Sequence, residues 1–286
     1  MRTVAIAGVG LIGGSFALAL RRAGFDGRVL GVSSERTIRE ALSLGVIDEG
    51  VTLAEAAARA DLIYLSQPIA RILETIPALG PLLRPGCLVT DAGSTKRRIV
   101  EEFSRSLPQG QFLGGHPMAG KETRGVAAAE AALFEGRTYV LTPVDEAQLE
   151  TPAARQLRSW LDRIGAVTLV MDASVHDCTV ALTSHLPQLA STALAAMLAS
   201  RLEENLRRAA GPGLVDMTRL AMSSYDLWRD ILETNSGPVG EALDAYIEAL
   251  VTLRSNLTAS AMNDRFADGG AFAAALRRTK APDSSE

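Results

Sequence analysis

The sequence predicts a two-domain α/β protein, in which a doubly wound sheet is followed by an all-α helical domain. The chain has 286 residues, which exceeds the usual size of a single domain. Its first half alternates short β-branched runs with amphipathic stretches, whereas after Asp172 strand signals vanish and Ala and Leu recur at helical spacing. We therefore expect one domain over residues 1–171 and a second over residues 172–286.

The strands of the first domain are expected where apolar and β-branched residues form short runs between turn residues. Amphipathic helices are expected over residues 15–23, 36–44 and 96–106. Because each helix would cross over from one strand to the next, the strands should be parallel. The predicted strands span residues 3–7, 28–32, 62–65, 87–91, 112–114, 138–142 and 167–171.

The second domain has a helical pattern that is punctuated only by Pro187, Pro212 and Pro238. Pro187 lies within a helical stretch, where the loss of a backbone hydrogen bond predicts a kink. The apolar faces are wider than one small bundle could bury. We therefore expect a homodimer with interlocked helices, and a thick monomeric core is the alternative.

Charge and cysteine content argue against several classes of protein. The chain has 29 Lys and Arg against 33 Asp and Glu, a formal charge of −4 without a basic run, so no nucleic-acid partner is expected. Cys87 and Cys178 are too few for a disulfide framework or a cysteine-based zinc site, so we expect no metal and a reducing, cytoplasmic location. Glycines within residues 8–14 interrupt the N-terminal apolar run, and no other run reaches ~20 apolar residues, so neither a signal peptide nor a membrane span is expected.

The first predicted strand runs into a glycine-rich turn with the spacing G-x-G-x-x-G. In this context Gly8 would make the tight turn, Gly10 would let the backbone approach a pyrophosphate, and Gly13 would let helix and strand pack closely. Leu11 and Ile12 complete the turn at the helix N-terminus, where the anion would lie. We therefore predict a dinucleotide site in a Rossmann-type domain, with a plain glycine-rich turn as the alternative.

The end of the second predicted strand indicates which dinucleotide binds. A domain selective for NAD usually carries Asp or Glu there, and that carboxylate repels a 2′-phosphate. Ser33 occupies this place, and Arg36 can reach a phosphate. We therefore predict NADP. NAD, or use of both cofactors, stays the alternative because Glu35 is adjacent and Arg36 could be an ordinary charge on a solvated loop.

Polar residues after two further strands suggest the chemical site, since ligands bind beyond the carboxyl ends of strands in such sheets. His116 lies in a Gly/Pro-rich segment that should form a loop and expose its imidazole, which favours a functional role over core packing. Ser94 could cap the helix expected to begin at Thr95. His185, on a mostly apolar helix, is more often a satisfied core residue. Arg219 is either a surface charge or a bidentate clamp for a carboxylate.

Five segments resemble, in the same order, those of the prephenate/arogenate (cyclohexadienyl) dehydrogenase family. The resemblance implies a Rossmann domain and a helical dimerisation domain without an appended regulatory domain. It also implies oxidative decarboxylation of arogenate or prephenate, with hydride transfer to NAD(P)⁺, in tyrosine biosynthesis. The segments are GVGLIGGS (8–15), DAGSTK (91–96), GHPMAG (115–120), SHLP (184–187) and DMTR (216–219).

The resemblance also implies roles for four residues. His116 matches the catalytic histidine that accepts the proton of the ring hydroxyl, and Ser94 matches a serine that hydrogen-bonds the same hydroxyl. Arg219 matches an arginine that binds a substrate carboxylate, and His185 would line the substrate pocket. A neutral imidazole suits proton removal near pH 7.

Two positions depart from the family pattern and bear on the substrate. Many members carry a second histidine where this chain has Gln188, and a basic residue near Val215. Fewer cations should penalise the dianionic side of prephenate relative to the zwitterionic side chain of arogenate. We therefore expect Gln188 to contact substrate and arogenate to be preferred.

Two other functions remain open from sequence. The β-hydroxyacid dehydrogenases also join a Rossmann domain to helices, but they resemble one another in using a lysine on the first helix of the second domain. Residues 172–210 contain no lysine. A non-catalytic dinucleotide sensor would bind cofactor without turnover, and it gives no reason for the order of His116, His185 and Arg219.

Overall fold

The computed structural model describes residues 1–108, 111–201, 204–258 and 260–280. The last six residues of the predicted second domain lie outside these ranges. The chain divides into two compact units, Met1–Val239 and Gly240–Glu286. No helix among the described residues is both long enough and apolar enough to cross a membrane.

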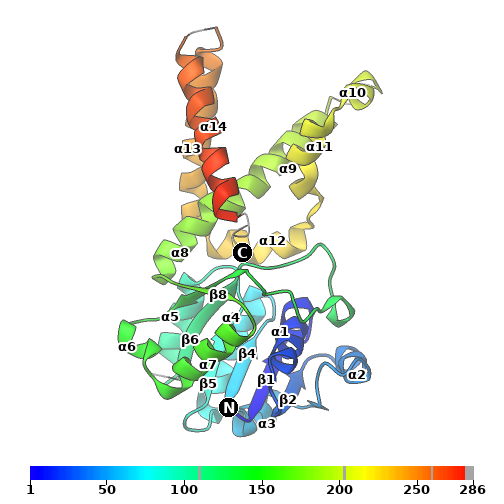
Figure 1. Ribbon diagram of the computed structural model, residues 1–286, viewed down its shortest axis with the longest axis vertical. Helices are drawn as coiled ribbons and strands as arrows, with labels where there is room; N and C mark the ends of the chain where they lie inside the picture. Colours follow the sequence, from blue (N-terminus) through cyan, green and yellow to red (C-terminus); the bar gives the residue numbers. More distant parts are fainter. Residues whose placement is uncertain (109–110, 202–203, 259, 281–286) are drawn as a thin grey trace, which may run out of the picture. The chain divides into compact units, whose positions relative to one another are not determined.

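An eight-stranded sheet forms the centre of the first unit (Figure 1), with the strand order β3-β2-β1-β4-β5-β6-β7-β8. The first six strands are parallel and have the Rossmann order, which confirms the predicted fold class. The strands are β1 (Thr3–Ala7), β2 (Arg28–Val32), β3 (Glu49–Gly50), β4 (Leu62–Leu65), β5 (Leu88–Asp91), β6 (Phe112–Pro117), β7 (Thr138–Thr142) and β8 (Val167–Val170).

The expectation that all strands are parallel is wrong for the last two. β7 runs antiparallel to β6, and β8 runs parallel to β7. A parallel pair needs a long crossover, usually a helix. The segment between β6 and β7 contains only the short 3₁₀ helix η2 (Val126–Ala128), so the chain turns back beside β6.

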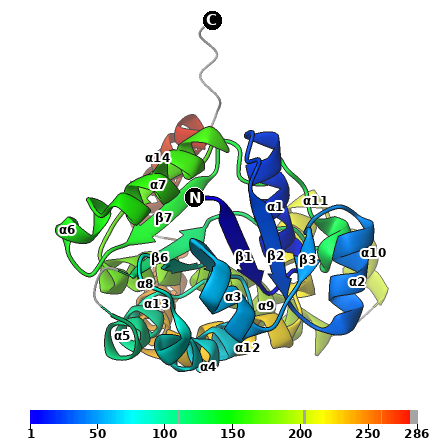
Figure 2. The ribbon, with the colours of Figure 1, turned by 90° about the horizontal axis from the view of Figure 1, so that it is seen from below.

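Helices cover both faces of the sheet, as Figure 2 shows for α1 and α7 on one face and α3, α4 and α5 on the other. The alternation of β1 creates the two cores. Val4 and Ile6 pack with Phe16 and Leu161, whereas Ala5 and Ala7 pack with the aliphatic side chains of α4. The helices are α1 (Leu11–Arg22), α2 (Glu35–Ser43), α3 (Leu53–Arg59), α4 (Ile69–Leu79), α5 (Arg97–Ser106), α6 (Glu146–Leu149) and α7 (Pro152–Arg163).

After β8 the chain is helical, as expected. A π-helical turn, η3, precedes Pro187, which is the second residue of α9 and cannot donate a backbone hydrogen bond. The elements are α8 (Ala173–Val180), η3 (Ala181–His185), α9 (Leu186–Ala199), α10 (Glu204–Ala209), α11 (Pro212–Thr218), η4 (Arg219–Met222), α12 (Tyr225–Thr234), α13 (Ser236–Ser255) and α14 (Ala261–Lys280).

Two carboxylates of the helical segment bind the N-termini of Rossmann helices. Asp177 of α8 accepts hydrogen bonds from the backbone N–H groups of Lys96 at 2.7 Å and Arg97 at 3.0 Å, where α5 begins. Asp230 of α12 accepts one from Ala70 at 3.0 Å, in the first turn of α4. Carboxylates at these positions satisfy free N–H groups and complement the helix dipoles. These contacts fasten α8 and α12 to the sheet domain.

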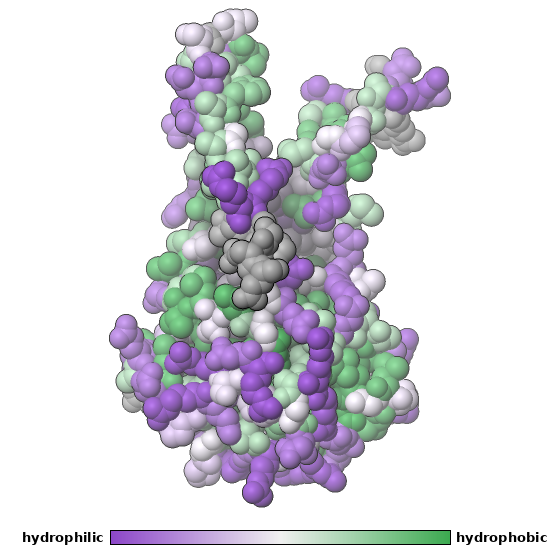
Figure 3. Space-filling view, viewed as in Figure 1, coloured by the Kyte–Doolittle hydropathy of each residue, from purple (hydrophilic) through white to green (hydrophobic). Residues whose placement is uncertain are grey.

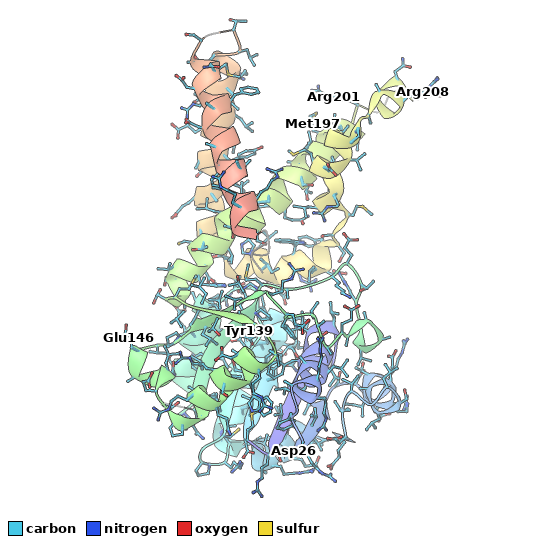
Figure 4. All side chains as sticks on the ribbon, viewed as in Figure 1. Asp26, Tyr139, Glu146, Met197, Arg201 and Arg208 are labelled. Carbon is cyan, nitrogen blue, oxygen red and sulfur yellow. The ribbon has the colours of Figure 1, made fainter. Side chains whose placement is uncertain are left out.

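The helices of the second unit expose many large apolar side chains. They are visible at the surface of α13 and α14 in Figure 3. Further exposed apolar residues lie in the first unit, including Met197, which Figure 4 labels near the end of α9. Among the described residues of the second unit, the large apolar side chains that are exposed are Ile247, Leu250, Val251, Leu257, Phe266, Phe272 and Leu276.

Candidate active site

The glycine-rich turn connects β1 to α1 at the carboxyl edge of the sheet. Gly8 has φ +96°, and a Cβ there would lie 2.7 Å from the backbone of Gln67. A Cβ at Gly13 would lie 2.4 Å from the Gly8 carbonyl oxygen and 2.6 Å from Ile6. A Cβ at Gly10, in contrast, would meet nothing within 4 Å. Two glycines are therefore required by backbone conformation and packing, and the third borders open space.

The start of α1 offers a seat for an anion. The helix begins at Leu11, four residues earlier than the sequence suggested. Gly14 N–H donates a hydrogen bond of 2.8 Å to the carbonyl oxygen of Gly10. The N–H groups of Leu11, Ile12 and Gly13 precede it and have no carbonyl one turn back in the helix. The first turn carries no acidic residue. These features fit the pyrophosphate of a dinucleotide.

Ser33 and Arg36 lie just beyond β2 and are exposed. Ser34, rather than Ser33, caps α2 by accepting a hydrogen bond from Thr37. Glu35 pairs with Arg39 at 3.5 Å, and both side chains are largely exposed. Arg36 therefore lies just beyond β2, where the ribose of a dinucleotide is expected. The nearby Glu35 pairs with Arg39 and not with Arg36.

His116 lies in β6, where it pairs with Val140 of β7. The expectation of an exposed loop is wrong here, because the strand continues to Pro117 and leaves the residue only 9% exposed. Burial lowers the pKa of His116 well below that of an ordinary histidine, and the nearby His176 and Lys96 act in the same direction. The imidazole is therefore neutral at pH 7.

His116 Nδ1 lies 2.8 Å from Nε2 of His176 on α8. His176 Nδ1 in turn lies 2.7 Å from a carboxylate oxygen of Asp177. Both of these α8 residues are almost fully buried. Burial also lowers the pKa of His176, although the hydrogen bond to Asp177 opposes the shift. The helical segment thus supplies a carboxylate–imidazole pair directly beside the candidate base.

A buried ion pair fixes the backbone next to His116. The Lys96 ammonium contacts the Asp91 carboxylate and donates a 2.7 Å hydrogen bond to the Gly115 carbonyl oxygen. Asp91 accepts in turn from Gly115 N–H at 3.1 Å and from Gly93 N–H at 2.8 Å. Desolvation lowers the pKa of Lys96, and Asp91 counteracts the shift. The pair therefore joins the ends of β5 and β6.

Sequence reasoning missed His176, Asp177 and Lys96 as parts of this site. One signal was available, because the chain has only three histidines and His176 precedes an acidic residue at the start of the helical domain. Lys96 closes a motif that was recognised, but nothing local reveals that it is fully buried. These contacts join residues up to 81 positions apart.

Ser94 lies in the turn between β5 and α5 and is half-buried. It does not cap α5, because that helix begins at Arg97 with Lys96 at the N-cap position. The alternative interpretation of Ser94 as a helix cap is therefore wrong. Its backbone position, between Gly93 and Thr95 at the carboxyl end of β5, places it on the same sheet edge as His116.

His185 is 1% exposed, at the end of the π-helical turn. Its Nδ1 lies 3.2 Å from the side-chain nitrogen of Asn235, which also donates to the Asp177 carbonyl oxygen at 2.8 Å. Burial lowers the pKa of His185 to about 4. The ring meets Trp228 edge to face at 5.8 Å, and the Trp228 Nε1–H is buried with no partner among the described residues. Asn235 thus connects His185 to the backbone of Asp177.

Gln188 lies one turn beyond His185 on α9 and is 4% exposed. Its Nε2 donates to the Leu220 carbonyl oxygen at 2.8 Å and to Thr192 at 3.2 Å. Both amide donors are therefore engaged within the protein, and the amide oxygen is left as the free acceptor in the described part of the chain.

Arg219 begins η4 and is largely exposed. Its guanidinium lies 3.7 Å from Glu122, in the segment that follows β6. In the same region Arg124 donates to Ser224 at 2.5 Å, and Lys121 pairs with Glu130. The segment after His116 is therefore linked to the start of α12. A cavity of about 530 Å³ between α5 and α6 includes none of the predicted site residues in its lining.

The chain matches two family models that together cover most of its length. Residues 16–170 match the prephenate dehydrogenase nucleotide-binding domain, and residues 172–269 match the prephenate dehydrogenase dimerization domain. A prephenate dehydrogenase of Bacillus subtilis is 34% identical over 88% of this chain and 69% of its own length.

Two solved structures are similar over nearly the whole chain. Prephenate dehydrogenase from Aquifex aeolicus, in complex with hydroxyphenyl propionate and NAD⁺, has a TM-score of 0.85 and 31% identity and covers 98% of each chain. Synechocystis arogenate dehydrogenase has a TM-score of 0.82 and 32% identity and covers 96% of this chain and 99% of its own. The predicted family is confirmed: the chain belongs to the prephenate dehydrogenase family and is an NAD(P)-dependent oxidoreductase.

Proposed function

We propose that the enzyme oxidatively decarboxylates arogenate in preference to prephenate, with NADP⁺ as hydride acceptor, in tyrosine biosynthesis. The reaction class follows from the family. The observation that carries the assignment of the site is the buried, neutral His116 on β6, on the sheet edge that also holds the glycine-rich turn. The domain boundary that we propose is the predicted one, between residues 171 and 172.

The proposed chemistry begins with removal of the ring hydroxyl proton by His116. The nicotinamide, when bound, supplies a hydride acceptor for the carbinol hydrogen. The bond to the ring carboxylate then breaks, carbon dioxide leaves and its electron pair completes the aromatic ring. Ser94 would hydrogen-bond the reacting hydroxyl, Arg219 would bind a substrate carboxylate, and His185 would line the pocket. The N-terminus of α1, with Gly8, Gly10, Leu11, Ile12 and Gly13, would hold the pyrophosphate.

Replacing His116 with Asn tests the proposed base. Loss of a positioned general base typically costs about 10²–10⁴-fold in rate, so kcat should fall by that order while the Kd for NADP⁺ changes little. Initial rates of nicotinamide reduction with arogenate or prephenate, crossed against NADP⁺ or NAD⁺, give the measurement. Near wild-type turnover in His116→Asn would remove His116 from the mechanism, and silence of the wild type in all four assays would overturn the proposed function.

The preference for arogenate rests on Gln188. Its amide donors are bound by Leu220 and Thr192, so the group left over is an acceptor. An acceptor suits the ammonium of arogenate and offers nothing to the second carboxylate of prephenate. Val215 itself is uncharged and exposed.

A Gln188→His variant should therefore shift the ratio of kcat/KM toward prephenate. One hydrogen bond to a charged group contributes about 1.5–3 kcal/mol, so a shift of about 10-fold or more is expected. Because both substrates are assayed on the same protein, a general loss of activity cancels in the ratio. An unchanged ratio would separate Gln188 from substrate choice.

We further propose a cytoplasmic homodimer, and the dimerization-domain match supports the assembly. The exposed apolar residues of α13 and α14 supply an area that a second copy could cover. Light scattering should give about twice the chain mass of 30.2 kDa.

A further inference from the structure

The neighbours of His116 determine which of its ring nitrogens carries a proton. The hydrogen-bonded series runs from Asp177 through His176 to His116, with separations of 2.7 Å and 2.8 Å. The two rings meet edge to face at 5.1 Å. All three residues are 9% exposed or less, so water cannot readily substitute for any of these partners.

The direction of each bond follows from the carboxylate. Asp177 also receives the N–H groups of Lys96 and Arg97, and a carboxylate that takes both of these donors acts only as an acceptor. His176 must then donate from Nδ1, and a neutral imidazole with a proton on Nδ1 has an unprotonated Nε2. That Nε2 faces His116 Nδ1, which must donate to it because two lone pairs would repel each other.

We propose that His176 and Asp177 are positioning residues, which hold His116 in the tautomer with a proton on Nδ1 and a free lone pair on Nε2. The inference rests on the proposed function insofar as it makes Nε2 the atom that accepts the substrate's proton. The helical segment, which supplies the pair, thereby prepares a base that belongs to the sheet domain.

The surroundings of Asp177 hold the series in place. One carboxylate oxygen accepts from Lys96 N–H and the other from Arg97 N–H, so the group is fixed by the start of α5. The Asp177 carbonyl oxygen accepts from Asn235. Upstream, Asp172 caps α8 through Ser174 and Val175. A histidine that merely filled space would not need a partner that is itself held by Lys96, Arg97 and Asn235.

The first test reads the tautomer without substrate. Because the chain has only three histidines, nitrogen-15 labelling of histidine gives three imidazoles whose ring shifts distinguish Nδ1–H from Nε2–H. At pH 7.5 the full-length protein should show His116 and His176 both protonated on Nδ1. A His116 ring protonated on Nε2 would overturn the proposal, whatever the enzyme's activity.

Two substitutions at His176 then separate orientation from packing. His176→Phe keeps a ring but removes the acceptor, so His116 should lose its single tautomer, and kcat should fall at least about 10-fold and at most about 10⁴-fold, the range reported for orienting partners. His176→Gln offers a carbonyl oxygen to His116 Nδ1, so it should partly restore both the single tautomer of His116 and kcat. The KM for NADP⁺ should change little in either variant.

Cys178→Ser provides the matched control, because Cys178 is the exposed neighbour of Asp177 on α8. It should leave tautomer and kcat unchanged. Equal kcat and an unchanged His116 tautomer in His176→Phe would overturn the proposal. If the tautomer is as expected but His116→Asn retains full turnover, the role proposed for His116 as the base fails while the positioning relation stands; silence of the wild type in all four assays would overturn the proposed function itself.

Discussion

Gly114 and Gly115 place His116 by letting β6 approach the strands on either side. A Cβ on Gly114 would lie 2.3 Å from the Thr142 hydroxyl, and one on Gly115 would lie 2.7 Å from the Asp91 carbonyl oxygen. The sequence interpretation took these glycines, with Pro117, as marks of a loop. They instead permit close packing within a sheet. Local composition could not distinguish the two cases, because the deciding atoms belong to β5 and β7.

Arg36 carries the prediction on cofactor choice at the residue scale. If its guanidinium binds the 2′-phosphate, Arg36→Gln removes a charge-assisted contact of about 1.5–3 kcal/mol. The Kd for NADP⁺ should then rise by about 10- to 100-fold, whereas the Kd for NAD⁺ should hardly change. Fluorescence titration with each cofactor measures both constants.

Arg39 offers the control for this prediction, since it lies one turn further along α2 and pairs with Glu35. Arg39→Gln should affect neither cofactor. If Arg36→Gln weakens NAD⁺ and NADP⁺ equally, Arg36 contributes a general attraction and does not select the phosphate.

At the scale of elements, the sequence pattern predicted most strands of the sheet. It missed the edge strand β3 and the reversed direction of β7 and β8. The runs of β1, β2, β4 and β7 match their observed bounds. The two-residue strand β3 was missed because so short a run carries no periodicity. The start of α1 was misplaced because glycines have poor helix propensity, yet here packing against β1 outweighs propensity.

The contact of α12 with α4 gives a prediction at this scale. Asp230 is 9% exposed and accepts from Ala70 N–H at 3.0 Å. Asp230→Ala removes the side-chain acceptor of this part-buried N–H at the start of α4, which costs about 0.5–2 kcal/mol in the free energy of unfolding. Urea unfolding of the pure variant measures the loss. Asp226→Ala, on an exposed position of the same helix, should change stability by less than about 0.5 kcal/mol; equal losses in both variants would contradict the capping role.

For the whole molecule, the contacts that build the site join distant segments, and sequence pattern alone could not supply them. His116 and His176 are 60 positions apart, and Ala70 and Asp230 are 160 apart. The family resemblance predicted His116, His185 and Arg219 as site residues, because a motif records selection on the assembled site. It did not predict His176, which lies outside the five matching motifs. Periodicity describes how an element faces a core, whereas pairing of buried polar groups depends on which elements meet.

The three buried histidines also make the stability of the folded chain depend on pH. Burial is the largest cause in each case, and it lowers the pKa of His116, His176 and His185. An unfolded chain restores the ordinary value of about 6.5. Below that pH the unfolded chain binds more protons than the folded chain. The free energy of unfolding therefore has its full value above about pH 6.5 and decreases as the pH falls.

His185 alone, with a pKa of about 4, should account for about 3 kcal/mol of this loss between pH 6.5 and pH 4. Urea midpoints at pH 7.5, 6.5, 5.5 and 4.5, with the slope of each transition checked for constancy, measure the dependence. His185→Asn should flatten the curve between pH 6.5 and 4.5, even if it lowers stability at pH 7.5, because one proton-binding difference disappears. A wild-type stability that stays constant from pH 7.5 to 5.5 would mean that the histidines bind protons equally in the folded and unfolded states, which would contradict their lowered pKa values.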